Sequence, residues 1–199
     1  MKRIAIALQL AGVVAALGGS AGAARAQVAV TPSIGAYIPA GDFHDLRDQA
    51  EQVRVQRDAA LALGLSAEFG WLRGTLAYVT GSRLTADGIE EQGEIGEGSL
   101  LIAAADLVLR PIPRLVVVQP YLLGGVGLKN TSYDYDDDGI SDAFPDDETD
   151  TTLHIGVGAD LMFGGIGVVA ELSDFISKDA EGDWGAHDAF ATIGLKFRL

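Results

Sequence analysis

The sequence predicts an all-β fold: an eight-stranded antiparallel up-and-down β-barrel that crosses a membrane with its strands, over residues 27–199. Three observations predict it. Segments in which apolar and polar residues alternate recur eight times, and the connections between them are short and long in turn. In the clearest segments one face is apolar and the other is small or charged. Alternation of period two marks a β-strand whose faces meet different surroundings, and a barrel in lipid turns its apolar face outward.

The first 26 residues predict a signal peptide that is cleaved after export, which leaves residues 27–199 as the barrel domain. Two basic residues at positions 2 and 3 precede an apolar run from position 4 to position 17. Ala24 and Ala26 then provide the small-x-small pattern of a signal-peptidase site. The apolar run is short for a membrane-spanning helix, which needs about 20 residues. We therefore expect export in a Gram-negative-type bacterium and cleavage after Ala26.

Strand alternation is clearest in three segments, 60–71, 152–163 and 188–199. In each of them Leu, Ile, Val, Phe and Ala alternate with Gly, Ser, Thr or a charged residue. The lumen of a small barrel has little room, so small residues with a few paired charges suit it. The eight expected strands are 27–39, 58–71, 74–83, 98–110, 115–129, 151–163, 166–177 and 187–199.

The connections predict which end of the barrel faces which side of the membrane. Short turns are expected at 72–73, 111–114 and 164–165, and long polar loops at 40–57, 84–97, 130–150 and 178–186. Outer-membrane barrels have short periplasmic turns and longer external loops. Phe69, Trp71, Phe163 and Phe197 share the apolar parity close to the short turns, where a periplasmic aromatic girdle belongs.

Composition excludes some classes of function. The chain has 199 residues, no cysteine and a formal charge of −14, from 14 Lys and Arg against 28 Asp and Glu. Without its three basic residues in positions 1–26, the mature chain carries 11 − 28 = −17. Such an acidic balance excludes nucleic-acid binding, which needs cationic groups that displace counterions. A chain without cysteine has no disulfide, so packing or the membrane must stabilise it.

Two stretches carry a resemblance to a known group. The C-terminal TIGLKFRL and the segment 119–128, QPYLLGGVGL, resemble the small outer-membrane barrel domains of the OmpA, OmpX and opacity type. The resemblance implies an outer-membrane location, contact with outer-membrane lipid, and a C-terminal pattern that the barrel-assembly machinery reads. Thr192, Gly194, Phe197 and Leu199 occupy that pattern, which ends in Leu199 where the group usually has Phe. Members include adhesins, anchors and proteins without assigned activity, so the resemblance specifies no chemistry.

Ionisable residues on the inward parity predict a charge network in the lumen. They are Glu68, Asp106, Asp160, Glu171, Lys196 and Arg198, with Arg110 and His154 beside them. One interpretation is a polar, porin-like channel or ion pathway. The favoured interpretation is a plug of ion pairs, because side chains fill an eight-stranded barrel and buried charges persist only when paired. Glu171 is expected to pair with Lys196 or Arg198, because their strands are neighbours.

The external loop YDYDDDGISDAFPDDETD, residues 133–150, predicts a candidate calcium site. Asp134, Asp136, Asp138 and Asp142 offer carboxylates, and Ile140 a backbone carbonyl, in a pattern that resembles EF-hand and thrombospondin type-3 loops. The twelfth position is Pro145, where an EF-hand has a bidentate Glu. The alternative is a solvated acidic loop that binds nothing. Beyond Ca²⁺ no cofactor is expected.

Three functional hypotheses follow. The first is a monomeric, non-enzymatic outer-membrane protein with a structural or surface-interaction role. The second is a soluble periplasmic barrel that binds a small apolar ligand, as lipocalins do. The third is an outer-membrane lipid-modifying enzyme, for which His187 and Asp188 at the outer rim are the residues to note. No catalytic motif supports it, since the sequence has no H-E-x-x-H and none of its three histidines has a recognisable nucleophile neighbour.

Overall fold

The computed structural model describes residues 28–40, 44–45, 54–87, 93–111, 118–135, 148–178 and 184–199. The predicted signal peptide, with Ala24 and Ala26, lies outside these residues, so its cleavage stays a prediction. None of the described segments forms a helix long and apolar enough to cross a membrane.

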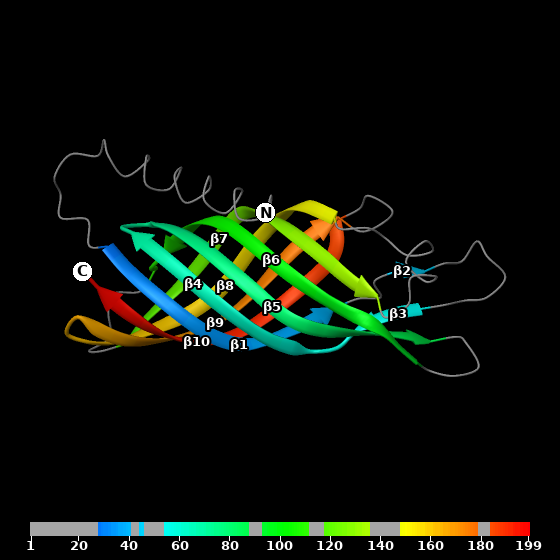
Figure 1. Ribbon diagram of the computed structural model, residues 1–199. Helices are drawn as coiled ribbons and strands as arrows, with labels where there is room; N and C mark the ends of the chain where they lie inside the picture. The colour runs from blue at the N-terminus through cyan, green and yellow to red at the C-terminus, as the bar shows by residue number, and fades with distance from the viewer. Residues whose placement is uncertain are drawn as a thin grey trace, which may run out of the picture.

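The described segments form one closed antiparallel barrel (Figure 1). Its eight strands are β1 (Val28–Ala40), β4 (Ala60–Phe69), β5 (Leu72–Asp87), β6 (Gly93–Leu109), β7 (Val118–Tyr135), β8 (Glu148–Phe163), β9 (Ile166–Lys178) and β10 (Trp184–Arg198). They follow one another round the wall in the order β5-β4-β1-β10-β9-β8-β7-β6, and the pairing of β5 with β6 closes the ring. The predicted eight-stranded up-and-down barrel is confirmed.

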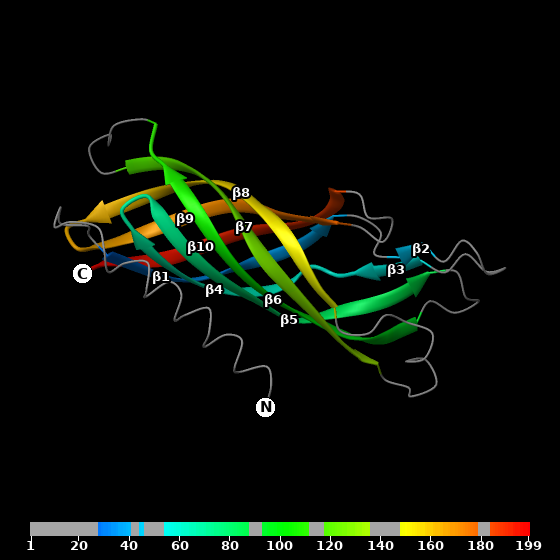
Figure 2. The ribbon, with the colours of Figure 1, turned by 90° about the horizontal axis from the view of Figure 1, so that it is seen from above.

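Two short strands extend the sheet beyond the barrel wall. β3 (Arg54–Arg57) pairs with the end of β5, and β2 (His44–Asp45) pairs with β3. Figures 1 and 2 show these strands, with the far ends of β5 and β6, projecting past the end of β1. We call this the loop end of the barrel, and the opposite end, where β4 joins β5 and β8 joins β9, the turn end.

The pairing register gives the barrel its stagger. Following Cα partners once round the wall from Val28 returns to β1 at Ile38, ten residues further along the strand. A stagger of this kind tilts the strands to about 35–45° from the barrel axis. Side chains that neighbour each other across strands therefore lie on rows that climb from the turn end to the loop end.

Side-chain parity matches the prediction throughout the three clearest segments. Large apolar residues such as Leu63, Ile155 and Leu195 are half exposed on the outer wall, whereas Ala62, His154 and Lys196 on the opposite parity are buried inside. Period-two alternation produces this arrangement, since successive side chains of a strand point to opposite faces. The barrel is thus apolar outside and has its buried charged residues inside.

Aromatic residues occupy both faces. Of the expected girdle, Trp71, Phe163 and Phe197 are exposed on the outer wall near the turn end, at 61%, 68% and 38%. Inside, an apolar cluster fills the middle and the loop-end half of the lumen; its buried members are Tyr37, Ala62, Ala77, Val79, Leu100, Ile102, Phe175 and Phe190.

Two expectations about connections need correction. The turn between β4 and β5 is Gly70–Trp71, and not Leu72–Arg73; Gly70 has φ 64°, a conformation that glycine adopts without strain. The tight turn between β8 and β9 is at Gly164–Gly165, as predicted, with φ 67° at Gly164.

The loop-end strands also run further than expected. β5 continues to residue 87 and β6 starts at 93, while β7 continues to 135 and β8 starts at 148, so much of the expected loops 84–97 and 130–150 is strand. The sequence of these extensions is mostly polar, so period-two hydropathy does not mark them as strands.

Candidate functional site

The charged lumen is the candidate site, and the stagger of the strands organises it. On the inner wall, Cα partners lead from Glu68 to Arg73, Asp106, Gly125, His154, Phe175 and Asp188. This single row climbs from the turn end towards the loop end. Five of its seven residues carry ionisable side chains, so the register itself places charges at successive heights in the lumen.

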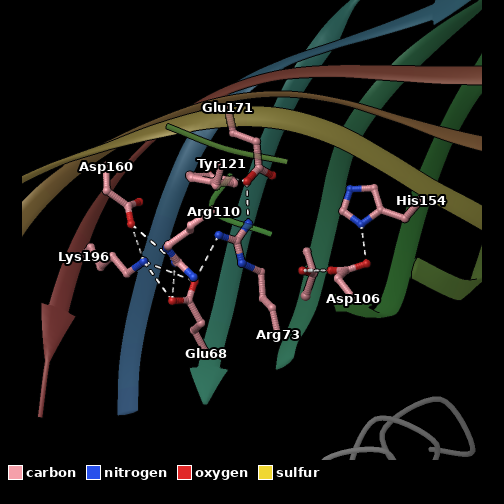
Figure 3. Close-up of polar contacts among 10 residues, drawn as sticks. Glu68, Arg73, Asp106, Arg110, Tyr121, His154, Asp160, Glu171 and Lys196 are labelled. Atoms are coloured by element: carbon pink, nitrogen blue, oxygen red, sulfur yellow. Dashed lines mark hydrogen bonds and ion pairs between the residues drawn. The ribbon is translucent and has the colours of Figure 1, made fainter. Parts of the chain in front are cut away.

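Glu68 is the centre of the turn-end cluster, which we define as Glu68, Arg73, Arg110, Tyr121, Asp160, Glu171 and Lys196 (Figure 3). Lys196 Nζ donates to both carboxylate oxygens of Glu68 at 3.2 Å and to Asp160 Oδ2 at 2.8 Å. Arg110 Nη2 donates to Glu68 Oε1 at 2.6 Å and lies 3.6 Å from Asp160 Oδ2. Glu68 therefore accepts hydrogen bonds from two different cations through these contacts alone.

Arg73 links Glu68 to the other half of the same cluster. Its Nη2 donates to Glu68 Oε2 at 3.2 Å and its Nη1 donates to Glu171 Oε2 at 2.5 Å. Tyr121 donates its hydroxyl to the same Glu171 oxygen at 2.6 Å, and the Arg73 guanidinium lies 4.8 Å from the Tyr121 ring centroid. Three cations thus face three carboxylates, which leaves the turn-end cluster with no net charge.

A second group lies higher on the inner row. His154 Nδ1 is 2.7 Å from Asp106 Oδ1, and Thr75 donates its hydroxyl to Asp106 Oδ2 at 2.7 Å. Both His154 and Asp106 are buried, and the imidazole stacks on the Phe175 ring with centroids 3.8 Å apart. His154 Nε2 has no hydrogen-bond partner among the described residues.

The loop-end cluster consists of Tyr37, Lys129, Ser177 and Asp188. Lys129 Nζ donates to Asp188 Oδ2 at 2.9 Å and to Ser177 Oγ at 2.6 Å. Tyr37 donates its hydroxyl to the other carboxylate oxygen, Asp188 Oδ1, at 2.6 Å. One cation and one carboxylate are paired here, so the charges balance as they do at the turn end.

Aromatic rings and a small cavity lie between the clusters. Phe190 packs against Tyr37 and Phe175, with ring centroids 5.3 Å apart in both pairs. The cavity measures about 40 Å³ and is lined in part by Arg73 and His154. A water molecule needs about 10–15 Å³ of such a cavity, so there is room for about three. The cavity is far too small for a lipophilic ligand of the lipocalin kind.

The structure brings most of the predicted lumen residues together. Glu68, Asp160 and Lys196 contact one another, while Asp106 lies higher with His154. The predicted pairing of Glu171 with Lys196 or Arg198 is wrong. Glu171 lies opposite Thr192, four residues from Lys196 along β10, and binds Arg73 and Tyr121 across the lumen.

Five members of the two clusters were not predicted as site residues: Arg73, Tyr121, Lys129, Tyr37 and Ser177. Arg73 was assigned to a turn, although its inward position follows once the turn is moved to Gly70–Trp71. Tyr121 and Lys129 lie on the inward parity of β7 and are buried, and that parity is the signal that could have found them.

His187 and Asp188, which the sequence placed together at the rim, point to opposite faces. Asp188 belongs to the loop-end cluster inside, whereas His187 faces outward and its Nδ1 lies 2.6 Å from Asp174 Oδ2 on the neighbouring strand β9. Consecutive residues of a strand cannot share a face. The polar pair on the outer wall is therefore Asp174–His187.

The remaining predicted residues are less informative. Asp134 lies on β7, its side chain is not described, and Asp136, Asp138, Ile140 and Asp142 lie outside the described residues. Within the described part of the chain, no group of three or more His, Cys, Asp or Glu side chains is placed to hold a metal ion. Of the C-terminal pattern, Thr192 and Gly194 face inward on β10, while Phe197 and Leu199 face outward.

The chain has recognisable structural neighbours. No protein-family profile matches the sequence, and no curated protein matches it. The fold is similar to the N-terminal β-barrel domain of Pseudomonas aeruginosa OprF, with 14% identity and a TM-score of 0.48, over 86% of this chain and 97% of that chain. It is also similar to the E. coli Outer Membrane Protein W, with 14% identity and a TM-score of 0.45, over 87% of this chain and 98% of that chain. At this identity the likeness concerns the fold alone.

Proposed function

We propose that this chain is a non-enzymatic outer-membrane β-barrel with a structural or surface-interaction role, whose lumen is closed by its own ion pairs. The observation that carries the proposal is the inverted distribution of side chains. The outer wall exposes rows of Leu, Ile and Val, whereas Glu68, Asp106, Asp160 and Lys196 are buried inside. Lipid is the surrounding in which that distribution is stable, because a transmembrane barrel needs an apolar outer band.

The outer wall argues against a water-soluble barrel. Soluble monomers rarely expose contiguous apolar patches beyond a few hundred Å². Here the exposed apolar residues continue round the wall, from Leu63 on β4 through Leu76, Leu101 and Leu122 to Ile193 on β10. A lipocalin-like barrel would need the opposite arrangement, with an apolar cavity inside. In this barrel the described residues form ion pairs inside the lumen.

The closed lumen is supported by the contacts that fill it. The turn-end cluster spans the lumen from β4 and β5 to β8, β9 and β10, and aromatic rings occupy the space above it. Buried ion pairs of this kind are costly to break, since each partner left behind is an unpaired charge. We therefore expect the parent protein, reconstituted in a planar bilayer, to show no steady ion conductance.

Cell fractionation and gel migration test the location. The protein should be recovered in the outer-membrane fraction, released by detergent and not by salt, and an unheated sample should migrate differently from a boiled one. N-terminal sequencing of the recovered protein should begin at Gln27. Recovery from the soluble periplasm without detergent would overturn the proposal.

The acidic external loop is proposed as a Ca²⁺ site on the sequence pattern alone. Carboxylates stand at positions 134, 136, 138 and 142, and the glycine at position 139 permits the sharp turn of a calcium loop. Calorimetric titration of the detergent-solubilised protein with Ca²⁺ should release heat, and Asp138→Ala should remove it. A parent that titrates without heat, as Asp138→Ala is expected to do, would show that the loop is merely solvated.

A further inference from the structure

An outward-facing groove of about 460 Å³ crosses β7, β8 and β9 on the apolar wall. Its floor is the cross-strand row of Leu123, Gly156 and Ser173, whose side chains point inward. The lower wall is the neighbouring row that faces outward, and it consists of Leu122, Val157 and Leu172. The upper wall is the next outward row, with Ile155 and Asp174.

Gly124 leaves this upper wall incomplete. It is the Cα partner of Ile155 in the same outward row, and an added Cβ would meet nothing closer than the His154 carbonyl oxygen at 4.0 Å. A larger side chain would therefore fit at this position and would narrow the entrance of the groove on the β7 side.

Asp174 is a charged residue on this otherwise apolar surface. The outward row that contains it runs Val28, Phe69, Leu72, Leu107, Gly124, Ile155, Asp174, Ala189, Ile38, and Asp174 is its only charged residue. A carboxylate on a lipid-facing wall costs free energy that increases with depth in the membrane. His187 binds Asp174 Oδ2, but the other oxygen, Oδ1, has no hydrogen-bond partner among the described residues.

A cation and an aromatic residue lie further towards the loop end, four residues beyond this carboxylate on β9. Lys178 follows Asp174 on the same face of β9 and is exposed, and its Cα partner Trp184 on β10 is 49% exposed. Lysine and tryptophan are the residues that anchor a barrel at the level of lipid headgroups. The Asp174–His187 pair therefore lies on the turn-end side of the level at which Lys178 and Trp184 mark the lipid headgroups, with the groove leading away from it along the apolar wall.

We propose that the groove binds one acyl chain of a phospholipid whose primary ammonium headgroup contacts Asp174. The proposal rests on the membrane location argued above. The charges are complementary: the ammonium is a positively charged hydrogen-bond donor, and the Asp174 carboxylate is a hydrogen-bond acceptor on a side chain that is 26% exposed. A charged hydrogen bond in this setting is stronger than a neutral one.

Catalysis by the same pair is not supported. A nucleophile must lie within hydrogen-bond reach of its base, and the described contact of the His187 ring is with Asp174 alone. A second copy of the chain is the competing occupant, since an apolar groove can also take a side chain of a neighbouring barrel. The mass of the complex distinguishes a lipid-bound monomer from a dimer.

Native mass spectrometry of the detergent-extracted full-length protein tests the proposal. The protein is titrated with ethanolamine, choline and glycerol phospholipids that have the same acyl chains. We expect at least tenfold tighter binding of the ethanolamine lipid than of the choline lipid, whose quaternary ammonium has no hydrogen to donate. Asp174→Asn should abolish this preference, and Gly124→Leu should weaken the binding of all three lipids.

The matched control is Ala67→Leu, which adds the same side chain to an exposed position on the outer wall of β4. It should bind like the parent. Heat-modifiable migration shows whether each variant is a folded barrel, so a failure of the membrane proposal is seen in the parent before any lipid is added. Equal binding of the ethanolamine and choline lipids by a folded parent, unchanged binding by folded Asp174→Asn, or a lipid-free dimer would each overturn the lipid site.

Discussion

The two ion-pair clusters of the lumen differ in redundancy. At the turn end, Glu68 contacts Lys196, Arg110 and Arg73, and each of these cations lies within 4 Å of a second carboxylate. At the loop end, Lys129 and Asp188 have only each other as charged partners in the described contacts. Both clusters are neutral, yet only the first can lose its lysine and still leave every remaining charge next to an opposite one.

The two lysines and the carboxylates nearest them differ in burial, and here the turn-end pair is the more deeply buried, although Glu171 and Arg110 in the same cluster are 12% and 25% exposed. The side chain of Lys196 is 2% exposed and that of Asp160 is fully buried, whereas Lys129 and Asp188 are 8% and 7% exposed. Deeper burial raises the cost of an unpaired charge. The comparison therefore sets redundancy against depth, and substitutions of single lysines can decide which of the two dominates.

Lys129→Met should have the largest effect. It leaves Asp188 with the hydrogen bond from Tyr37 and with no cation among its described contacts, which is expected to cost about 3–5 kcal/mol of unfolding free energy. Urea unfolding of the protein reconstituted in vesicles, followed by heat-modifiable migration, measures the loss. The double variant Lys129→Met with Asp188→Leu should recover most of it, because a buried pair replaced by apolar groups leaves no stranded charge.

Lys196→Met should cost less, about 1–3 kcal/mol in the same assay, because Glu68 keeps Arg110 and Arg73 and Asp160 keeps Arg110. The exposed Glu148→Gln at the start of β8 is the control and should leave the midpoint unchanged. If Lys196→Met lowers the unfolding free energy more than Lys129→Met does, depth of burial outweighs redundancy, and the turn-end cluster depends more on its lysine than the loop-end cluster does.

Much of the architecture could be predicted because it depends on one-dimensional patterns. Alternation marked all eight strands, and Glu68, Asp106 and Lys196 were placed inside on parity alone. The partner of Glu171 could not be found in that way. The pairing of β9 with β10 sets Glu171 opposite Thr192. Its partner Arg73 lies across the lumen on β5, and the side chains that meet across a barrel depend on the stagger of the whole ring of strand pairings.

Other omissions had visible signals. A turn placed two residues too late removed Arg73 from the lumen, although Gly70 was available for a turn that needs a positive φ. On the outer wall, Asp174 interrupts the apolar parity of segment 166–177, and that interruption is the signal in the sequence that could have identified it. Its partner His187 follows only from the pairing of β9 with β10.

The smallest expected effect compares the two tyrosines that complete the clusters. Tyr37→Phe removes the donor to Asp188 Oδ1, while Lys129 remains on Oδ2, so one carboxylate oxygen loses the partner it has among these contacts. Tyr121→Phe removes a donor from Glu171 Oε2, but Arg73 donates to that same oxygen, which therefore stays bonded. Tyr37→Phe should cost about 1 kcal/mol more than Tyr121→Phe, because a buried acceptor without a partner is penalised. Both variants keep the aromatic ring, so only the hydroxyl hydrogen bond is removed. Equal losses of unfolding free energy in the urea assay would contradict the prediction. They would mean that a second hydrogen bond to Glu171 Oε2 contributes as much as the single tyrosine hydrogen bond to Asp188 Oδ1.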